Sequence, residues 1–405
     1  MNTFQIAFRN LRRNRTRTSI SIATIGIATA VLILSNALTL GMVDDASRNV
    51  IDLGVGEAQV HAPGYLVEQS IHDSLKDPDA VLARARERGV AAAPRALAGG
   101  LLAAGDKSAG LRFWGIDPAA ERELGKLPRH LRSGQFLPDT PDRRVVLGGG
   151  LARALAVGVG AEVAMVVQGL DGSVSTELLR VSGVLDNVGE AIDRGTALID
   201  RRDFEQIFSA PGKVHEIALS THGRMSADDL VATMSGASPG AEVKSWRALK
   251  PAVASVVDIW EGSTLILAVI FFLAAGLGVL NTMLMASYER IPEFGTIKAL
   301  GATPGRIVRD VAAEAFVLAA LSTALGAALG TGLAWLAETR GLDLSVLGTR
   351  FSFSGVTLQS VWRAKLTPSG VYGPVVLMLG VAVAAALYPA IKAARLDPVK
   401  ALVHV

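Results

Sequence analysis

The side chains that most often carry catalysis or bind metals are few in this chain, and they are not spaced for either task. The 405 residues include six histidines and no cysteine, so thiol catalysis, disulfides and cysteine-ligated metals are excluded. The histidines at 61, 72, 130, 215 and 222 form no H-x-x-x-H pair, the spacing of a helical zinc site. We therefore predict no catalytic residue, no metal site and no cofactor bound by this chain.

Phosphate chemistry is equally poorly supported. The run Gly148-Gly149-Gly150 lacks the strand–helix context of a phosphate loop, and we interpret it as a turn before a helix at Leu151. No G-x-x-x-x-G-K-[ST] signature occurs anywhere in the sequence. If ATP and its Mg²⁺ are used, we expect both to be bound by a separate polypeptide.

Four long stretches without Asp, Glu, Lys or Arg dominate the chain: Thr18–Val43, Gly262–Tyr288, Ala315–Ala337 and Leu366–Ile391. Each is long enough to cross a hydrocarbon core, which takes about 20 apolar residues. A charge at the bilayer centre costs about 2.5–3.5 kcal/mol, yet 19% of all residues are charged. We therefore predict an α-helical membrane protein with four transmembrane helices and a large polar domain between the first two.

The polar domain at 44–261 is long enough for its own core, in one or two lobes. Its pattern predicts helices at Asp79–Gly89, Arg201–Phe208 and Ser226–Gly236, and Asp171-Gly172 is typical of a hairpin turn. Alternating or buried apolar runs predict strands at Glu162–Gln168, Glu177–Val184, Thr196–Ile199 and Glu216–Ser220. We predict an α+β domain. The net charge is only +3 and no basic stripe is interleaved with aromatics, so nucleic acid is a poor partner.

Basic residues near the N-terminus orient the chain. Five arginines and no acid precede the first stretch: Arg9, Arg12, Arg13, Arg15 and Arg17. The positive-inside rule then predicts cytoplasmic N- and C-termini and an extracytoplasmic polar domain. A cleaved signal peptide is the alternative for the first stretch, although its apolar run exceeds the usual length.

The expected organisation follows from these boundaries. A cytoplasmic amphipathic helix at 1–17 is predicted to lie on the inner leaflet, in contact with membrane lipid. The other expected segments are the first span at 18–43, the outer domain at 44–261, the second span at 262–288, a cytoplasmic loop at 289–310, the third span at 311–337, an outer loop at 338–370, the fourth span at 371–391 and a cytoplasmic tail at 392–405.

The cytoplasmic loop predicts a short helix with clear ends. Pro292 suits a first helical turn, Gly301 suits the residue after a helix, and Thr303-Pro304 suits the start of the next one. Phe294, Ile297 and Leu300 are predicted to share one face. They would form an apolar knob on the cytoplasmic surface, either against the membrane or docked into a partner.

The loop and the chain ends resemble the FtsX/MacB family of ABC-transporter permeases. The matching segments are Ala7–Leu11, Asn281–Met285, Glu289-Arg290, Glu293–Gly295, Ala299–Ala302 and Tyr388–Leu402. Ile291-Pro292 departs from the more polar residues usual in the family. The spacing Gly326-x-x-x-Gly330 permits a close helix approach but does not by itself define a dimer face.

The resemblance implies a permease subunit of a bacterial inner membrane, with its polar domain in the periplasm. It implies that Glu293, Phe294, Gly295, Ile297, Leu300 and Gly301 contact separate ABC ATPase subunits, which would hold ATP and Mg. It also implies a second permease copy or paralogue in the complex.

The short motif Gly115–Pro118, followed by Glu121 and Leu124, is most similar to the lipoprotein-releasing permeases of the LolC/LolE type. That resemblance implies lipoprotein cargo passed to a periplasmic carrier. Two alternatives stay open: MacB-like export with an adaptor and an outer-membrane channel, and FtsX-like control of a cell-wall hydrolase.

Overall fold

The computed structural model describes residues 15–125, 127–186, 188–236, 240–343 and 361–395, with the short pieces 352–353 and 356–357. The chain divides into two compact units. The helical unit comprises Met1–Asp44, Asp258–Gly348 and Ser360–Val405, and the sheet unit comprises Asp45–Val257 and Thr349–Gln359. The predicted amphipathic helix at 1–17 lies almost wholly outside the described residues, as does most of the predicted tail at 392–405.

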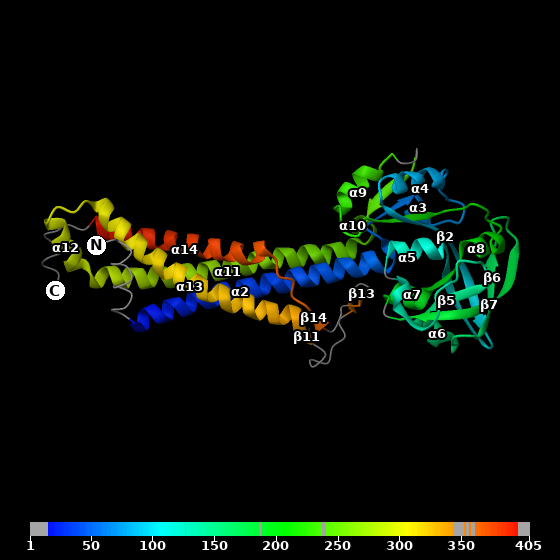
Figure 1. The fold of residues 1–405 in the computed structure, drawn as a ribbon, viewed down its shortest axis with the longest axis horizontal. Coiled ribbons are helices and arrows are strands. Elements are labelled where there is room, and N and C mark those ends of the chain that lie inside the picture. The colour runs from blue at the N-terminus through cyan, green and yellow to red at the C-terminus, as the bar shows by residue number, and fades with distance from the viewer. Residues whose placement is uncertain are drawn as a thin grey trace. The chain divides into compact units, whose positions relative to one another are not determined.

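Four long helices build the helical unit (Figure 1). They are α2 (Arg15–Val50), α11 (Pro251–Glu289), α13 (Pro304–Arg340) and α14 (Pro368–Ala394). All four are long and apolar enough to cross a membrane. Side chains from each meet in one buried cluster that includes Ile25, Met283, Ala319 and Ala386. The four uncharged stretches therefore form the four candidate membrane helices that the sequence predicted.

Helices α2 and α13 approach so closely that only glycine fits between them. A Cβ atom added to Gly326 would lie 2.3 Å from the carbonyl oxygen of Gly26, and one added to Gly330 would lie 2.8 Å from the Cα of Ala30. The close approach predicted from the Gly326–Gly330 spacing is thus confirmed. The structure uses this face for a contact inside the chain, so it is not a free dimer face.

The segment before α14 is held against α2 within the same unit. The Lys365 N–H donates to the carbonyl oxygen of Ala37 at 2.8 Å, and Lys365 Nζ forms an ion pair with Asp44 at 2.7 Å. Strand β14 (Val361–Trp362) precedes it and pairs with β11 (Leu342–Asp343) directly after α13. The described part of the predicted outer loop is therefore attached to α2.

A ten-stranded sheet is the frame of the sheet unit. The strand order is β10-β1-β9-β2-β3-β8-β5-β7-β4, with β6 pairing with both β2 and β7. The pairs β3–β8 and β5–β7 are parallel and the others are antiparallel. The strands are β1 (Ala58–His61), β2 (Ala91–Ala104), β3 (Lys107–Ile116), β4 (Leu131–Gly134), β5 (Arg144–Gly148), β6 (Glu162–Gln168), β7 (Val174–Leu185), β8 (Thr196–Asp200), β9 (Glu216–Ser220) and β10 (Glu242–Ser245).

Short helices cover this sheet. They are α3 (Tyr65–Glu68), α4 (Pro78–Glu87), α5 (Pro118–Leu124), α6 (Gly149–Leu155), α7 (Glu190–Gly195), α8 (Arg201–Ile207), α9 (Ala227–Met234) and α10 (Trp246–Leu249). A π-helical turn at Ile51–Val55 and a 3-10 turn at Leu127–His130 complete the set, and the two-residue strands β12 (Ser352–Phe353) and β13 (Val356–Thr357) pair with each other. The predicted mixture of helices and strands is confirmed, including the three predicted helices and four predicted strands to within a few residues.

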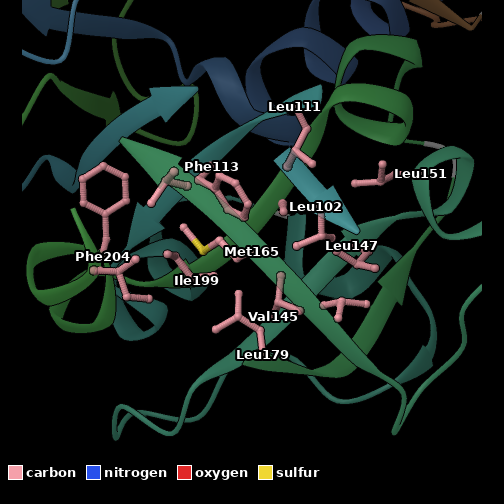
Figure 2. Packing of buried hydrophobic residues seen from close by; sticks show 14 of the residues in the cluster. Leu102, Leu111, Phe113, Val145, Leu147, Leu151, Met165, Leu179, Ile199 and Phe204 are labelled. Atoms are coloured by element: carbon pink, nitrogen blue, oxygen red, sulfur yellow. The ribbon is translucent and has the colours of Figure 1, made fainter. Parts of the chain in front are cut away.

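Two apolar cores support the two ends of the sheet. The larger lies between β2, β3, β5–β8 and helices α6 and α8, with Phe113, Met165 and Phe204 at its centre (Figure 2). The smaller joins β1 and β9 to helices α4 and α9 through residues such as Val60, Val81 and Leu230. The sheet unit therefore has the two lobes that the sequence left open, joined by the continuous strand β2.

Gly148–Gly150 begin α6 as predicted, and close packing explains the glycines. A Cβ at Gly148 would lie 2.3 Å from the carbonyl oxygen of Ile192, and one at Gly150 would lie 2.9 Å from that of Asp193. The run therefore admits the neighbouring α7 segment, which is a structural role.

Candidate functional site

The helix predicted in the loop between the second and third long helices is present as α12 (Ile291–Ala299). Its C-terminus is closed by two backbone bonds: Gly301 N–H to the Lys298 carbonyl at 2.9 Å, and Ala302 N–H to the Ile297 carbonyl at 3.1 Å. Gly301 has a φ of 93°, a conformation that glycine adopts without strain. Thr303 then caps α13 and Pro304 is its first residue, as the sequence predicted.

Arg290, directly before α12, holds the helix to α13. Its Nη1 bonds Glu314 Oε2 at 2.8 Å, and its Nε bonds Glu293 Oε2 at 3.0 Å. The guanidinium also lies 5.1 Å above the ring centre of Phe294, a distance at which a cation is attracted by the ring face. Because Glu314 is only 8% exposed, removing Arg290 would leave a poorly hydrated carboxylate.

Phe294 does not form part of an exposed knob, so that part of the sequence prediction is wrong. Its side chain is 3% exposed and packs against Ile307 and Val311 of α13 and Ala390 and Ala393 of α14. The physical reason is that α13 and α14 together provide an apolar cleft that the sequence of the loop alone does not reveal. Gly295 is buried beside it.

The outer face of α12 carries the apolar side chains that have no cover within this chain. Leu300 is 83% exposed and Ile297 is 41% exposed. Thr296, Ala299 and Gly301 are also exposed around them. The helix is therefore amphipathic in an unusual sense: one apolar face is buried inside the unit, and a second apolar patch, formed by Ile297 and Leu300, faces outward.

A second anchor lies at the end of α12. Lys298 Nζ donates to the carbonyl oxygen of Ala394, in the last turn of α14, at 2.8 Å. Lysine at that position neutralises part of the negative end of a helix dipole. Together, Arg290, Phe294 and Lys298 attach α12 to both α13 and α14. A displacement of α12 would therefore reach both helices directly.

Of the residues predicted to contact an ATPase, the structure brings Ile297, Leu300 and Gly301 to the exposed side of the loop. It places Glu293 half-buried against Arg290, and Phe294 and Gly295 inside. Sequence reasoning missed the pairing of Arg290 with Glu314. Glu314 was noticed as an acid at the start of an apolar helix, but its partner is 24 residues earlier, beyond the reach of helical spacing.

The sheet unit offers no comparable catalytic constellation. Within the described ranges, no group of three or more His, Asp or Glu residues could hold a metal ion. His61 and His215 are both fully buried and flank Tyr65, with ring centres 5.6 and 5.7 Å from it. Burial lowers the pKa of both histidines. Each is therefore neutral near pH 7 and serves as a structural residue.

A buried ion cluster joins the two lobes of the sheet unit. Arg95 of β2 is 0% exposed and bonds Glu121 through two nitrogens, at 2.5 and 3.0 Å, and Glu216 at 2.9 Å. Its Nη1 also donates to the carbonyl oxygen of Gly54, in the π-helical turn that follows α2. Arg95 thus links β2, α5 and β9 to that turn.

Comparison with known proteins fits this division of the chain. The FtsX-like permease C-terminal model matches residues 265–398, and the MacB-like periplasmic core domain model matches residues 18–237, more than half of the chain. The chain belongs to the FtsX/MacB family of ABC-transporter permeases. As an FtsX/MacB permease it has four candidate membrane helices and a MacB-like domain of mixed α/β structure, and members of the family work with ABC ATPases.

Several relatives of this FtsX/MacB permease are named for lipoprotein release. It is 24% identical to the lipoprotein-releasing system transmembrane protein LolC of Xylella fastidiosa, over 96% of this chain and 95% of that protein. It is 22% identical to the LolC protein of Neisseria meningitidis, over 77% of this chain and 78% of that one.

Other relatives are named for macrolide export. The MacB protein of Syntrophobacter fumaroxidans is 28% identical over 40% of this chain, which spans 20% of that protein. The solved periplasmic region of MacB from Actinobacillus actinomycetemcomitans covers 49% of this chain and 94% of its own length, with 13% identity and a TM-score of 0.37.

Proposed function

We propose that this permease converts ATP hydrolysis by a separate ATPase subunit into motion of its sheet unit, and so extracts lipoproteins from the bacterial inner membrane. The observation that carries this proposal is the similarity to LolC proteins along nearly the whole chain, over 96% of it in one case. The MacB relatives match a smaller part, such as 40% of the chain.

In this proposal α12 is the site where the ATPase acts. Ile297 and Leu300 dock into the partner, because they are the apolar side chains that α12 leaves exposed. ATP and Mg²⁺ belong to the partner. The anchors at Arg290, Phe294 and Lys298 then pass the movement of α12 to α13 and α14.

The orientation follows from the positive-inside rule: α12 and both termini face the cytoplasm, and the sheet unit lies in the periplasm. Helices α2 and α11 continue without a break into residues of the sheet unit, at 45–50 and 251–257. These two helices carry the motion outward. A second permease copy or a paralogue completes the complex and, with it, the path by which cargo reaches a periplasmic carrier.

The composition of the helices favours a lipid-bearing cargo. The uncharged stretches contain no ionisable Asp, Glu, Lys or Arg, and Glu314, just before the third of them, is paired with Arg290. An ion or proton path would need unpaired ionisable groups in the membrane. Acyl chains need none.

The test is mass spectrometry of the tagged chain, gently purified from its native membrane and scored for polypeptides and acyl chains. We expect an ATPase and acylated lipoproteins in stoichiometric amounts. A Leu300→Asp variant serves as a control, because it should lose the ATPase while keeping its own fold. An ATPase together with an adaptor or a hydrolase, and no acylated polypeptide, would contradict lipoprotein extraction.

A second candidate is MacB-like export of a peptide or small molecule from the periplasm. It is favoured by the match of residues 18–237 to the MacB-like periplasmic core domain. Copurification of a periplasmic adaptor that bridges to an outer-membrane channel would support export over extraction.

A further inference from the structure

Strand β2 has an open stretch along one edge. On one side it pairs with β3 from Arg95 to Ala104. On the other side it pairs with β9 only over 91–95 and with β6 only over 101–103. Residues 96–100 therefore have a strand neighbour on one side alone, in the middle of the ten-stranded sheet.

Backbone groups of this stretch point into the gap. The Arg95 carbonyl accepts from His215 N–H at 2.9 Å, and the Leu97 N–H donates to His215 Nδ1 at 2.9 Å. Because residues two apart in a strand direct their N–H and C=O to the same side, those of Gly99 point the same way. Among the described residues, neither group of Gly99 has a hydrogen-bond partner.

The glycines here are not explained by packing inside the chain. A Cβ added to Gly100 would lie 2.6 Å from Val167, and one added to Gly115 would lie 2.5 Å from Phe204, so both must be glycine. A Cβ added to Gly99 or Gly110 would have no described atom within 4 Å, and neither residue has a positive φ. Glycine within a strand is unfavourable unless another backbone or a ligand approaches closely.

A groove of about 380 Å³ lies over Gly99. Its lining includes Tyr65, Glu68 and Gln69 of the α3 segment, together with Leu97 and Arg112. Arg112 stands directly opposite Gly99 on β3, and its Nη2 donates to Gln69 Oε1. The wall is fixed because Tyr65 is 2% exposed and packed between two buried histidines. The groove therefore combines an open strand edge, a bare floor and one cation.

We propose that this groove binds an extended polypeptide segment of a partner protein, which pairs with the open edge of β2 at Gly99 and sets a carboxylate against Arg112. Strand addition uses main-chain hydrogen bonds for affinity and side-chain pockets for specificity. The Gly99 N–H and C=O supply the first, and Arg112 and Leu97 supply the second. Glu68, on the same rim, disfavours a segment with several acids. The site does not depend on which cargo the permease moves.

The test begins with a random heptapeptide library displayed on phage and selected on the full chain in lipid nanodiscs. The consensus peptide is then synthesised, and its binding is followed through a fluorophore on Leu101→Cys. This residue is 39% exposed and lies two positions beyond Gly99. Because the chain has no cysteine, the label is unique.

Four variants separate the proposed site from the rest of the surface. Gly99→Val fills the floor and Arg112→Glu reverses the charge; each should weaken the peptide by about tenfold or more, as expected for losing a charge-assisted or main-chain bond. Gly158→Val and Arg180→Glu are the matched controls. Gly158 also has open space at its Cβ position, and Arg180 is likewise an exposed strand arginine. The controls should leave binding unchanged.

The peptide backbone provides an independent readout. Methylating alternate amide nitrogens of the consensus peptide removes the donors that strand pairing needs, so binding should be lost in one methylation register and kept in the other. The proposal is overturned if no selected peptide depends on both Gly99 and Arg112, or if both methylated peptides bind equally. It is also overturned if Leu101→Cys chains form disulfide-linked dimers through this face, because a second copy would then be its occupant.

Discussion

Leu300 gives a quantitative test of the docking surface on α12. Its side chain is 83% exposed, so Leu300→Ala should change the free energy of unfolding of the isolated chain by no more than about 0.5 kcal/mol. If the ATPase covers this side chain, the variant loses the burial of about three carbon atoms. At about 0.8 kcal/mol for each buried CH₂ group, association should weaken by about 2 kcal/mol, or about 30-fold in Kd.

The assay is a titration of the copurified ATPase onto the chain in lipid nanodiscs, with ATP hydrolysis as a second readout. Leu178→Ala is the matched control, because Leu178 is another exposed leucine, 63% exposed, on β7 of the sheet unit. Phe294→Ala provides the contrast. Since Phe294 is 3% exposed in the cleft between α13 and α14, its loss should destabilise the chain by about 3–5 kcal/mol.

The reasoning is refuted if Leu300→Ala binds the ATPase as tightly as the unchanged chain while Leu178→Ala weakens it. It is also refuted if Leu300→Ala lowers the thermal midpoint as much as Phe294→Ala, because Leu300 would then be a core residue. Weaker binding with an unchanged midpoint is the outcome that the exposed fractions predict.

Three further predictions concern the sheet unit. Arg95→Met should destabilise it by about 3–5 kcal/mol, because Glu121 and Glu216 keep their charges without a buried partner; hydrogen exchange of the β2 and β9 amides measures this, and unchanged protection would contradict it. Gly115→Ala should cost about 1–3 kcal/mol through overlap with Phe204, whereas Gly110→Ala should be neutral or slightly stabilising; equal effects in thermal unfolding would disprove the packing argument. Burial lowers the pKa values of His61 and His215, so the unfolded chain binds more protons below about pH 6.5, and stability should fall as the pH drops from there, by up to about 1.4 kcal/mol per pH unit for each histidine. A flatter pH profile in His61→Gln would confirm this sign, and an unchanged one would exclude it.

The parts of the structure that follow from local patterns were predictable. Long uncharged stretches form helices whatever surrounds them, and strands such as β6 and β9 alternate or are uniformly apolar in the way that a sheet requires. The end of α12 was equally clear, because Gly301 and Thr303-Pro304 are local determinants of helix ends.

Strand β2 shows what could not be predicted. Ala91–Ala104 is rich in alanine and glycine, which have low strand propensity, so its own residues do not predict a strand. It is a strand because β3, β9 and β6 all pair with it. The burial of Phe294 and the Arg290–Glu314 pair depend in the same way on α13 and α14 coming together, which is a tertiary property.

The glycine contact between α2 and α13 has a consequence for how the chain is made. Gly26 leaves the ribosome early, whereas Gly326, whose Cβ position lies against the Gly26 carbonyl, follows after most of the protein has been synthesised. During that interval the small-residue face of α2 has no packing partner from this chain and is exposed to lipid or to insertion factors. Chains truncated before Pro304 should therefore be recognised as incomplete at α2, even though the whole of that helix has been inserted.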